Sequence, residues 1–385
     1  MYNFNNSVTS KVRIALFIPS LAVGGSERQL IELAKGLNKF NWEVIVLIMY
    51  GGDSLLEEAT SLPGVKVINL RKRNSFLFIW KLLNYILKEN IEVLYCFLPT
   101  AQLYALLIKV FLPKVKIICR IGDSISSYKD LGYKNVIVNF MLKVLRNNSD
   151  VYIFNSHAGR KAKDLGAFTK KIKVICNGID TNRFQPSQIL RQKLRSDLKL
   201  SEKVILVGCL GNFSVYKDHR TFINAAVVVR QVCKNVHFLT IGDHNTLLGK
   251  KAINYVKVME MESHFTFLGI RKDVECILPA LDIGCLSSIT EGFPNSICEL
   301  MASGVPCVVT DVGDAALIVG DAGVVVAKSD PKALANGLIS LLKLSLSERI
   351  ILGQRAKVKI FEQYHLSRMF VANEELLESL LAGKE

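Results

Sequence analysis

Short runs of β-branched and aliphatic residues alternate along the chain with longer segments whose apolar residues recur every three or four positions. The short runs predict a first series of strands at residues 12–18, 43–49, 65–70, 93–97, 116–120, 151–154 and 173–175. They predict a second series at residues 204–210, 237–241, 265–268, 283–286, 306–309 and 323–326. The longer segments predict helices between nearly all of these strands, for example at residues 26–39, 101–111, 218–232 and 331–344. Such alternation is typical of parallel sheets, so we expect an α/β protein with two doubly wound, Rossmann-like domains.

A polar and charged stretch at residues 182–203 separates the two series of strands. A length of 385 residues suits two or three domains. The pattern predicts an N-terminal domain over residues 1–185 and a C-terminal domain over residues 186–361. Ligands of doubly wound sheets bind at the carboxyl ends of the strands, so we expect the site in a cleft between two facing sheets.

The charge of the chain is concentrated in its first half. The net charge is +15, and residues 1–190 hold 26 Lys and Arg against 13 Asp and Glu, a difference of +13. Residues 191–385 hold 23 against 21, a difference of +2. This asymmetry predicts an anionic partner for the first half, either nucleic acid or an acidic membrane surface. Basic stripes interleaved with stacking aromatic residues do not occur, so we do not expect nucleic acid.

A basic cluster of Arg71, Lys72 and Arg73 precedes a strongly apolar helical segment, residues 76–88, which contains Trp80. Such a segment could lie at an anionic lipid surface. The alternative is a helix that is simply buried against a sheet. The apolar runs are too short to span a bilayer, and the first ten residues have no signal-peptide core. We therefore expect a cytoplasmic protein that is peripheral at the inner face of the cell membrane.

The chain has nine cysteines, which occur singly and mostly inside apolar runs. No C-x-x-C pair and no cluster of Cys with His is present. We interpret them as reduced core residues, not as disulfides or zinc ligands.

Two carboxylates, Glu291 and Glu299, lie eight residues apart across a Gly-Phe-Pro turn that leads into a helix. Asn295 or Ser296 is a good N-cap, so we expect Glu299 in the first helical turn and Glu291 in the loop before it. Gly292 lets the backbone approach a ligand closely. Free N–H groups of residues 293–297 suit a sugar hydroxyl or a phosphate. The alternative is a helix-capping acid beside a solvated loop acid.

Two further loops follow predicted strands. Gly24 and Gly25 lead into a helix with Ser26 as the expected cap, and the helix start can bind a phosphate. The loop lacks the G-x-G-x-x-G pattern, which disfavours a nicotinamide-dependent dehydrogenase. Lys217, just before the helix at 218–232, could neutralise a diphosphate, although an isolated loop lysine is usually only solvated.

Taken together, these loops resemble the family 4 retaining glycosyltransferases, which have the two-domain GT-B fold. The resemblance covers nearly the whole chain and rests on an ordered set of segments, residues 24–27, 154–156, 174–180, 211–218, 267–269, 291–299 and 302–306. It implies transfer of a hexose-type sugar from a nucleotide-diphosphate sugar, the co-substrate, to a hydroxyl with retained anomeric configuration. It implies no other cofactor. It also implies that a C-terminal helix, within residues 362–385, crosses back to the N-terminal domain.

The resemblance also assigns roles to residues. Lys217 would contact the donor diphosphate, and Gly24 and Gly25 would let the backbone approach it. Glu299 would hold the ribose hydroxyls and Glu291 would face the transferred sugar, which makes Glu291 and Lys217 the expected catalytic residues. Backbone amides of the segment that contains Phe293, Pro294, Asn295 and Ser296 would bind sugar hydroxyls and phosphate.

The sequence departs from the family pattern in two places. Asn212 stands where the family usually has Arg, so either Arg271 or another basic residue substitutes for it, or the donor binds more weakly. Arg120 and Asp123 stand where many members carry a sugar-contacting His, so they are candidates for sugar or acceptor contact.

The resemblance to the family leaves the acceptor open. A basic, apolar N-terminal domain favours a lipid-linked saccharide of bacterial surface polysaccharide (O-antigen, capsule or exopolysaccharide), although a soluble acceptor is the alternative. No D-x-D motif occurs in the chain, so we expect metal independence. Two rival functions are a nucleotide-sugar epimerase of the same fold and a non-catalytic membrane-binding module.

Overall fold

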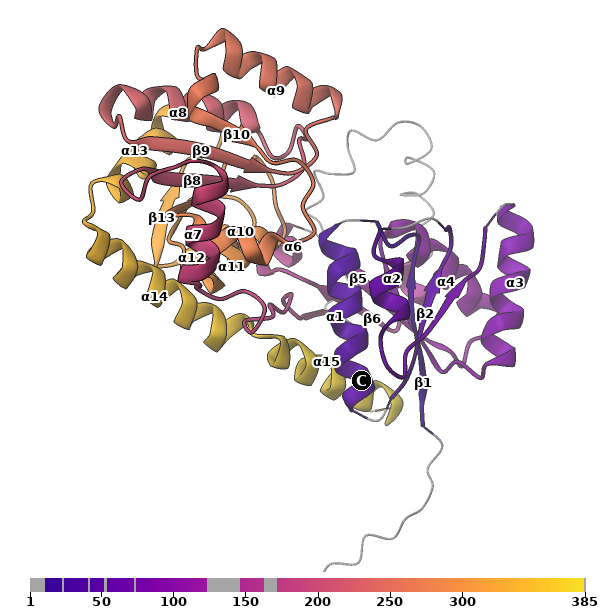
Figure 1. The fold of residues 1–385 in the computed structure, drawn as a ribbon. Helices are drawn as coiled ribbons and strands as arrows, with labels where there is room; N and C mark the ends of the chain where they lie inside the picture. Colours follow the sequence, from indigo (N-terminus) through magenta and orange to yellow (C-terminus); the bar gives the residue numbers. More distant parts are fainter. Residues whose placement is uncertain are drawn as a thin grey trace, which may run out of the picture. The chain divides into compact units, whose positions relative to one another are not determined.

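The structure, a computed structural model, describes residues 11–22, 24–40, 42–51, 54–72, 74–122, 146–162 and 172–383 (Figure 1). The chain divides into two compact units. Unit 1 comprises Met1–Asn155, Lys163–Ile175 and Met369–Glu385, and unit 2 comprises Ser156–Ala162 and Cys176–Arg368. Two residues of the sequence predictions, Arg73 and Asp123, lie outside the described residues.

Unit 1 contains a seven-stranded parallel sheet in the order β3-β2-β1-β4-β5-β6-β7. The strands are β1 (Arg13–Ile18), β2 (Glu43–Ile48), β3 (Lys66–Asn69), β4 (Val93–Phe97), β5 (Lys116–Ile121), β6 (Val151–Phe154) and β7 (Ile172–Val174). Its helices are α1 (Gly25–Lys39), α2 (Leu56–Thr60), α3 (Ser75–Lys88), α4 (Pro99–Phe111) and, from Met369 onward, α15 (Leu366–Leu381). The central strands are buried on both faces, which explains their continuous apolar sequence.

Unit 2 contains a six-stranded parallel sheet in the order β10-β9-β8-β11-β12-β13. The strands are β8 (Ile205–Leu210), β9 (Val236–Ile241), β10 (Phe265–Phe267), β11 (Ile283–Leu286), β12 (Cys307–Thr310) and β13 (Gly323–Val326). The helices are α6 (His157–Ala162), α7 (Gln188–Asp197), α8 (His219–Val232), α9 (Leu247–Val258), α10 (Val274–Ile277), α11 (Asn295–Ala302), α12 (Ala315–Val319), α13 (Pro331–Leu342) and α14 (Leu346–Tyr364). Every predicted strand is confirmed to within one residue at each end.

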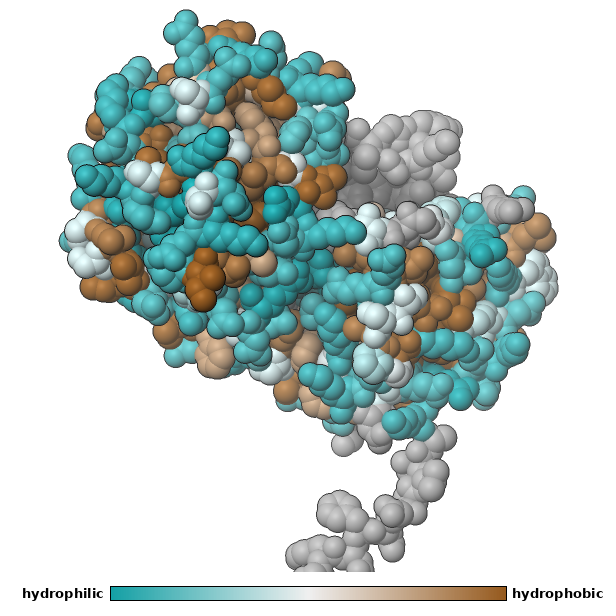
Figure 2. All heavy atoms as spheres, viewed as in Figure 1, coloured by the Kyte–Doolittle hydropathy of each residue, from teal (hydrophilic) through white to brown (hydrophobic). Residues whose placement is uncertain are grey.

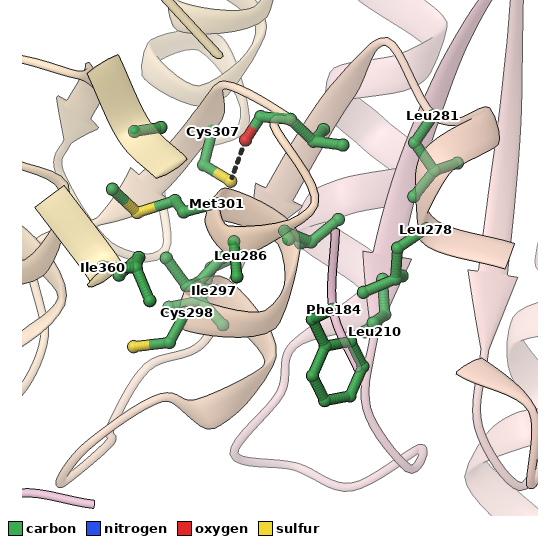
Figure 3. Close-up of a cluster of buried hydrophobic side chains, with 14 of the residues drawn as sticks. Phe184, Leu210, Leu278, Leu281, Leu286, Ile297, Cys298, Met301, Cys307 and Ile360 are labelled. Atoms are coloured by element: carbon green, nitrogen blue, oxygen red, sulfur yellow. Dashed lines mark hydrogen bonds between the residues drawn. The ribbon is translucent and has the colours of Figure 1, made fainter. Parts of the chain in front are cut away.

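Alternating residues of β8 pack into two separate apolar layers of unit 2. Leu206 and Leu210 belong to the layer that contains α11 and Ile360 of α14 (Figure 3). Val207 and Cys209 belong to the layer on the other face, with Phe222 and other residues of α8 and α13. Successive side chains of a strand point to opposite faces, so β8 is held by apolar packing on both sides. The carboxyl end of this strand is therefore a rigid support for the loop that follows it.

The division of the chain differs from the predicted boundaries at 185 and 361. Residues 176–185 belong to unit 2, where the Ile179 N–H donates to the Tyr364 carbonyl (2.8 Å) and the Leu366 N–H donates to the Ile179 carbonyl (3.1 Å). The C-terminal helix joins unit 1 only from Met369. In unit 1 the Tyr95 hydroxyl donates to Asn373 Oδ1 (2.8 Å). Hydrogen bonds between residues that are distant in sequence set these boundaries. The polar stretch at 182–203, from which the boundary was predicted, marks only a change in composition.

All nine cysteines are free thiols, as predicted, and six of them are buried. Within the residues that the structure describes, no helix is both long and apolar enough to cross a membrane.

Helix α1 packs against α15 at a glycine, which generates a stability prediction. A Cβ on Gly36 would lie 2.3 Å from Cδ1 of Phe370. Gly36→Leu should therefore overpack unit 1 and lower the free energy of unfolding by about 1–3 kcal/mol in urea denaturation. Lys39→Leu, an exposed position of the same helix, is the control and should change it by no more than about 0.5 kcal/mol.

A second substitution checks the cause of that loss. Phe370→Ala removes the ring, so Gly36→Leu should cost less in the Phe370→Ala background than in the wild type. Equal costs in both backgrounds would show that α1 does not pack on Phe370.

Candidate active site

The order of strands in unit 2 creates a switch point beside β8. The chain runs outward from β8 to β9 and β10, and then returns to the opposite side of β8 at β11. The loops that follow β8 (residues 211–218) and β11 (residues 287–294) therefore leave the carboxyl ends of adjacent strands in diverging directions. Doubly wound sheets bind their ligands at such a point.

The two expected catalytic residues meet at this switch point. Lys217 Nζ and Glu291 Oε1 lie 2.6 Å apart, although the residues are 74 positions apart in sequence. The Lys217 and Glu291 side chains are 27% and 12% exposed. The Ser288 hydroxyl donates to the same oxygen of Glu291 (2.6 Å). A diphosphate that reaches Lys217 would have to compete with the Glu291 carboxylate for the ammonium group.

Hydrogen bonds tie the two loops to each other and to β12. The Ser287 hydroxyl donates to the Lys217 carbonyl (2.8 Å), and the Ile289 N–H donates to the Tyr216 carbonyl (2.8 Å). The Thr310 hydroxyl, fully buried at the end of β12, donates to the Ser288 carbonyl (2.7 Å). The backbone that carries the Lys217–Glu291 pair is therefore fixed on both sides.

The loop after β9 needs glycine because the backbone of the loop after β8 lies close to it. Gly242, at the end of β9, has φ of +152°, and a Cβ there would lie 2.2 Å from the Gly211 carbonyl oxygen. A Cβ on Gly211 itself would lie 3.2 Å from Cδ of Lys217. The Lys217 side chain therefore passes directly over the Gly211 backbone.

The family arginine is missing from this chain. Asn212, which stands at its position, and Arg271, its suggested substitute, lie in different loops. Asn212 lies in the same loop as Lys217, and its Oδ1 accepts a hydrogen bond from the Asp243 N–H (3.0 Å), which links the loops after β8 and β9. Arg271 follows β10 and forms a two-bond ion pair with Asp273 (2.8 and 2.7 Å). Arg271 would have to give up or share Asp273 to neutralise a donor phosphate, so its role stays a prediction.

The expectation that Glu299 lies in the first turn of its helix is wrong. Helix α11 begins at Asn295 with Pro294 as its cap and with no side-chain capping bond, so Glu299 is the fifth helical residue and lies in the second turn. The Pro294 carbonyl accepts the N–H groups of Ile297 (3.1 Å) and Cys298 (3.4 Å). The Ile297 amide is therefore not available to a ligand, contrary to the sequence expectation.

Three amides at the start of α11 remain available in the described part of the chain. The N–H groups of Phe293, Asn295 and Ser296 donate to no acceptor among the described residues. The side chain of Phe293 packs on the Tyr364 ring (5.3 Å between centroids), so only its backbone can face a ligand. Pro294 is also buried and has no N–H to donate. Asn295 Oδ1 accepts a hydrogen bond from Asn177 Nδ2 (2.8 Å).

The loop after β12 packs against the backbone of Glu291 and Gly292. The sequence analysis did not predict this contact. Gly313 has φ of +55°, and a Cβ there would lie 2.5 Å from the carbonyl oxygens of both Glu291 and Gly292. The Asp314 N–H donates to the Gly292 carbonyl (3.0 Å), and the Asp314 carboxylate accepts the N–H groups of His157 and Ala158 (2.7 and 2.8 Å). One feature of the sequence could have indicated this contact, because the loop follows the carboxyl end of a strand that lies beside β11.

Two of the remaining candidates lie at the start of α1, in unit 1. Helix α1 begins at Gly25 and its cap is Gly24, so the expectation of Ser26 as cap is wrong by two residues. The Glu27 side chain folds back over Gly24, where its Oε2 lies 2.3 Å from the position of an added Cβ. A carboxylate thus occupies the space beside Gly24 in this structure.

Arg120 lies in β5 and is 4% exposed. Its guanidinium donates to the Tyr95 hydroxyl (3.1 Å) and the Ile175 carbonyl (3.2 Å). This internal network links β4, β5 and the residue after β7, and it leaves little of the side chain for an acceptor.

His219, the first residue of α8, is buried beside Lys217 and stacks on the Phe213 ring (3.9 Å between centroids). Its pKa is lowered to about 4, mainly by burial and to a smaller extent by the Lys217 charge, while the Gly211 backbone opposes the shift. Neither ring nitrogen has a hydrogen-bond partner in the described structure. The ring is therefore neutral near pH 7 and adds no positive charge to the site.

The buried His219 makes the protein less stable in acid. Above pH 6.5 the ring is neutral in both the folded and unfolded states and has no effect. Between pH 6.5 and about 4 the unfolded chain binds a proton that the folded chain does not, so the free energy of unfolding falls by up to about 1.4 kcal/mol per pH unit. His237 has a similarly lowered pKa and contributes separately.

His219→Phe should reduce this slope, because phenylalanine fills the same stack without titrating. The check is urea unfolding of both proteins at several pH values from 7.5 to 4.5. An unchanged slope in the variant would show that His219 titrates normally in the folded protein.

Comparison with known proteins places these loops in a family. Residues 23–183 match the family model "Glycosyltransferase Family 4", and residues 204–344 match the model "Glycosyl transferases group 1". Among the described residues, no group of three or more His, Cys, Asp and Glu side chains is placed to hold a metal ion.

Individual relatives agree with the family models. The chain is 29% identical to an Escherichia coli UDP-Gal:alpha-D-GlcNAc-diphosphoundecaprenol alpha-1,3-galactosyltransferase over 152 residues, 39% of each protein. It is 22% identical to a Campylobacter jejuni N-acetylgalactosamine-N,N'-diacetylbacillosaminyl-diphospho-undecaprenol 4-alpha-N-acetylgalactosaminyltransferase over 92% of this chain and 97% of that protein. The crystal structure of Anabaena HepE in complex with UDP and glucose matches 96% of this chain and all of that one, with a TM-score of 0.83 and 22% identity. The chain therefore has the GT-B fold and belongs to the family 4 glycosyltransferases.

Proposed function

We propose that the protein transfers a hexose-type sugar from a nucleotide-diphosphate sugar to a hydroxyl acceptor, with retained anomeric configuration, at the switch point of unit 2. The observation that carries the proposal is the Lys217–Glu291 pair, which brings a cation and a carboxylate from two loops to the carboxyl ends of β8 and β11. Consumption of a nucleotide sugar distinguishes this enzyme from a non-catalytic membrane-binding module. Release of free nucleoside diphosphate distinguishes it from an epimerase.

The proposed chemistry places negative charge on the leaving group. The bond between the anomeric carbon and the diphosphate oxygen breaks, and the acceptor oxygen forms the new bond and gives its proton to the departing diphosphate. The nucleoside diphosphate leaves with the bonding electrons. Lys217 and the free amides of Phe293, Asn295 and Ser296 are donors that can stabilise that charge in a fixed geometry.

Glu291 has two roles in this scheme. It holds the Lys217 ammonium in place before the donor binds, and it faces the transferred sugar, where positive charge develops in the transition state. Glu299, one turn into α11, would hold the ribose hydroxyls. We propose that the reaction needs no metal, because Lys217 and the amides supply the positive potential that a divalent ion supplies in other glycosyltransferases.

The proposed acceptor is a lipid-linked saccharide at the inner face of the cell membrane. Two relatives act, by their names, on diphospho-undecaprenol-linked saccharides. Helix α3 of unit 1 offers a surface for such a membrane. Phe78, Leu82 and Ile86 are buried against the sheet, whereas Phe76, Leu77 and Trp80 are 68%, 67% and 57% exposed on the other side.

Helix α3 is therefore packed against the sheet on one face and has apolar residues at the surface on the other (Figure 2). Arg71 and Lys81 are exposed near the apolar residues. Lys72 is half-buried and bound to the Tyr50 hydroxyl (3.1 Å), so its charge is less available to lipid. This arrangement favours insertion of aromatic side chains with electrostatic support.

Lys217→Ala should lower kcat at least ~100-fold, because it removes a charge-assisted contact to the leaving diphosphate. Lys343→Ala, an exposed lysine at the end of α13, is the matched control and should keep wild-type turnover. Initial rates of nucleoside diphosphate release measure both. Near-normal turnover of the Lys217 variant would remove this residue from the mechanism.

The two glutamates should respond differently to removal of charge. Glu299→Gln should raise the donor KM more than it lowers kcat, because it removes binding that is equal in ground and transition states. Glu291→Gln should lower kcat ~100-fold or more with a smaller change in KM. Steady-state kinetics with and without EDTA provide the check. The scheme fails if both folded variants are fully active, or if activity is lost on chelation and returns with manganese.

The protein should bind liposomes that contain anionic lipid, and Trp80→Ser and Phe76→Ser should each weaken the binding. Neutralising Arg71, Lys72 and Arg73 together should also weaken it, and salt should have the same effect because charges are screened within ~8 Å at physiological ionic strength. Ile351→Ser, at an exposed apolar position of α14, is the control. Co-sedimentation that responds to neither lipid charge nor salt would rule out the membrane surface.

A further inference from the structure

A pocket of about 510 Å³ lies in unit 2 between the first turn of α8, the loop residues 213–215 and the exposed side of α9. Its walls are mainly apolar and come from Phe213, Val215, Ile223, Leu248 and Ala252. Neither Lys217 nor Glu291 lines it. Its volume is in the range of sites that enclose small organic ligands. The donor chemistry proposed above makes no use of this pocket.

Two cations stand at the pocket without a carboxylate partner. Arg220 and Lys251 both line it, and among the described residues no carboxylate oxygen lies within 4.0 Å of a nitrogen of either side chain. The Arg220 guanidinium lies over the Tyr255 ring, 5.2 Å from the centroid. The Tyr255 hydroxyl donates to Asn224 Oδ1 (2.7 Å), which fixes that ring.

The single carboxylate of the lining is already engaged. Asp218 caps α8, where its carboxylate accepts the Thr221 N–H (3.2 Å) and the Thr221 hydroxyl (2.7 Å). His219, which also lines the pocket, is neutral. Asp218 keeps its negative charge, so the lining has two positive charges against one negative charge, and its net positive charge comes from Arg220 and Lys251.

We propose that this pocket is a second ligand site and that it binds a small amphipathic anion, a molecule with one aromatic or branched apolar body and one carboxylate, phosphate or sulfonate group. The body fills the space between Ile223, Leu248 and Ala252. The anionic group pairs with Arg220 and Lys251 at the polar side. Apolar walls without these cations would favour a neutral ligand, and the cations without the walls would bind only a hydrated ion.

The test uses the full chain and 8-anilinonaphthalene-1-sulfonate, a fluorescent probe with an aromatic body and one sulfonate. N-phenyl-1-naphthylamine has the same aromatic body without the charge and serves as the neutral comparator. The sulfonate probe should bind in a saturable titration and more tightly than the neutral one. Lys251→Gln and Arg220→Gln should each weaken the sulfonate probe at least ~5-fold and leave the neutral probe nearly unchanged. Lys250→Gln, at the neighbouring exposed position of α9, is the matched control and should bind like the wild type.

Two further variants locate the probe. Ala252→Trp fills the pocket and should abolish binding of the sulfonate probe. Leu248→Asp, at a partly exposed position, places a negative charge at the pocket and should weaken that binding. The second variant keeps the proposal testable if the tryptophan variant does not fold. Lys217→Ala and added UDP should leave it unchanged, because Lys217 does not line the pocket. Titrations that overlay for wild type and both pocket variants would overturn the proposal. So would displacement by UDP together with insensitivity to Lys251→Gln, since the probe would then occupy the donor site.

Discussion

The parallel pairing of strands on both sides of β8 is the constraint on which the candidate site depends. A parallel sheet is covered on both faces, so its strands carry apolar residues and the polar chemistry is confined to the loops at their ends. Because β9 and β11 lie on opposite sides of β8, the loops after β8 and β11 diverge from one point. Lys217 and Glu291 are brought together by this topology and not by proximity in sequence.

The Lys217–Glu291 pair is poorly explained as a device for stability. Partly exposed ion pairs contribute little to folding, because desolvation and side-chain ordering offset most of the Coulombic attraction. Neighbouring hydrogen bonds nevertheless hold the pair in a defined position, because the Ser288 hydroxyl donates to the Glu291 carboxylate and the Thr310 hydroxyl donates to the Ser288 carbonyl. A cation held at a defined position by an exchangeable partner suits a site that accepts a diphosphate. In the proposed scheme, the Glu291 carboxylate is then left beside the departing sugar.

The sequence predicted the strands closely because buried β-branched runs leave few alternatives, and the ends of β8 and β11 then located the loops. The exact start of a helix depends on which neighbouring residue becomes its cap, and this could not be predicted from the sequence. Pro294 took the cap position of α11 and moved Glu299 into the second turn. Arg120 looked available in sequence because a strand-end arginine is usually exposed, whereas Tyr95 and Ile175 hold it inside unit 1. The supporting roles of Ser288 and Gly313 require tertiary contacts that no spacing rule contains.

A thermal-shift panel of UDP-, GDP- and ADP-sugars against wild-type protein and Lys217→Ala tests most directly whether Lys217 binds the donor diphosphate. A donor at ~100 times its Kd should stabilise the folded wild type by ~2.7 kcal/mol. We expect at least one nucleotide sugar and its nucleoside diphosphate to raise the Tm of the wild type. The rise should be much smaller for the variant, because the diphosphate loses its cation. Equal shifts for both proteins, or no shift with any donor, would contradict a diphosphate site at Lys217.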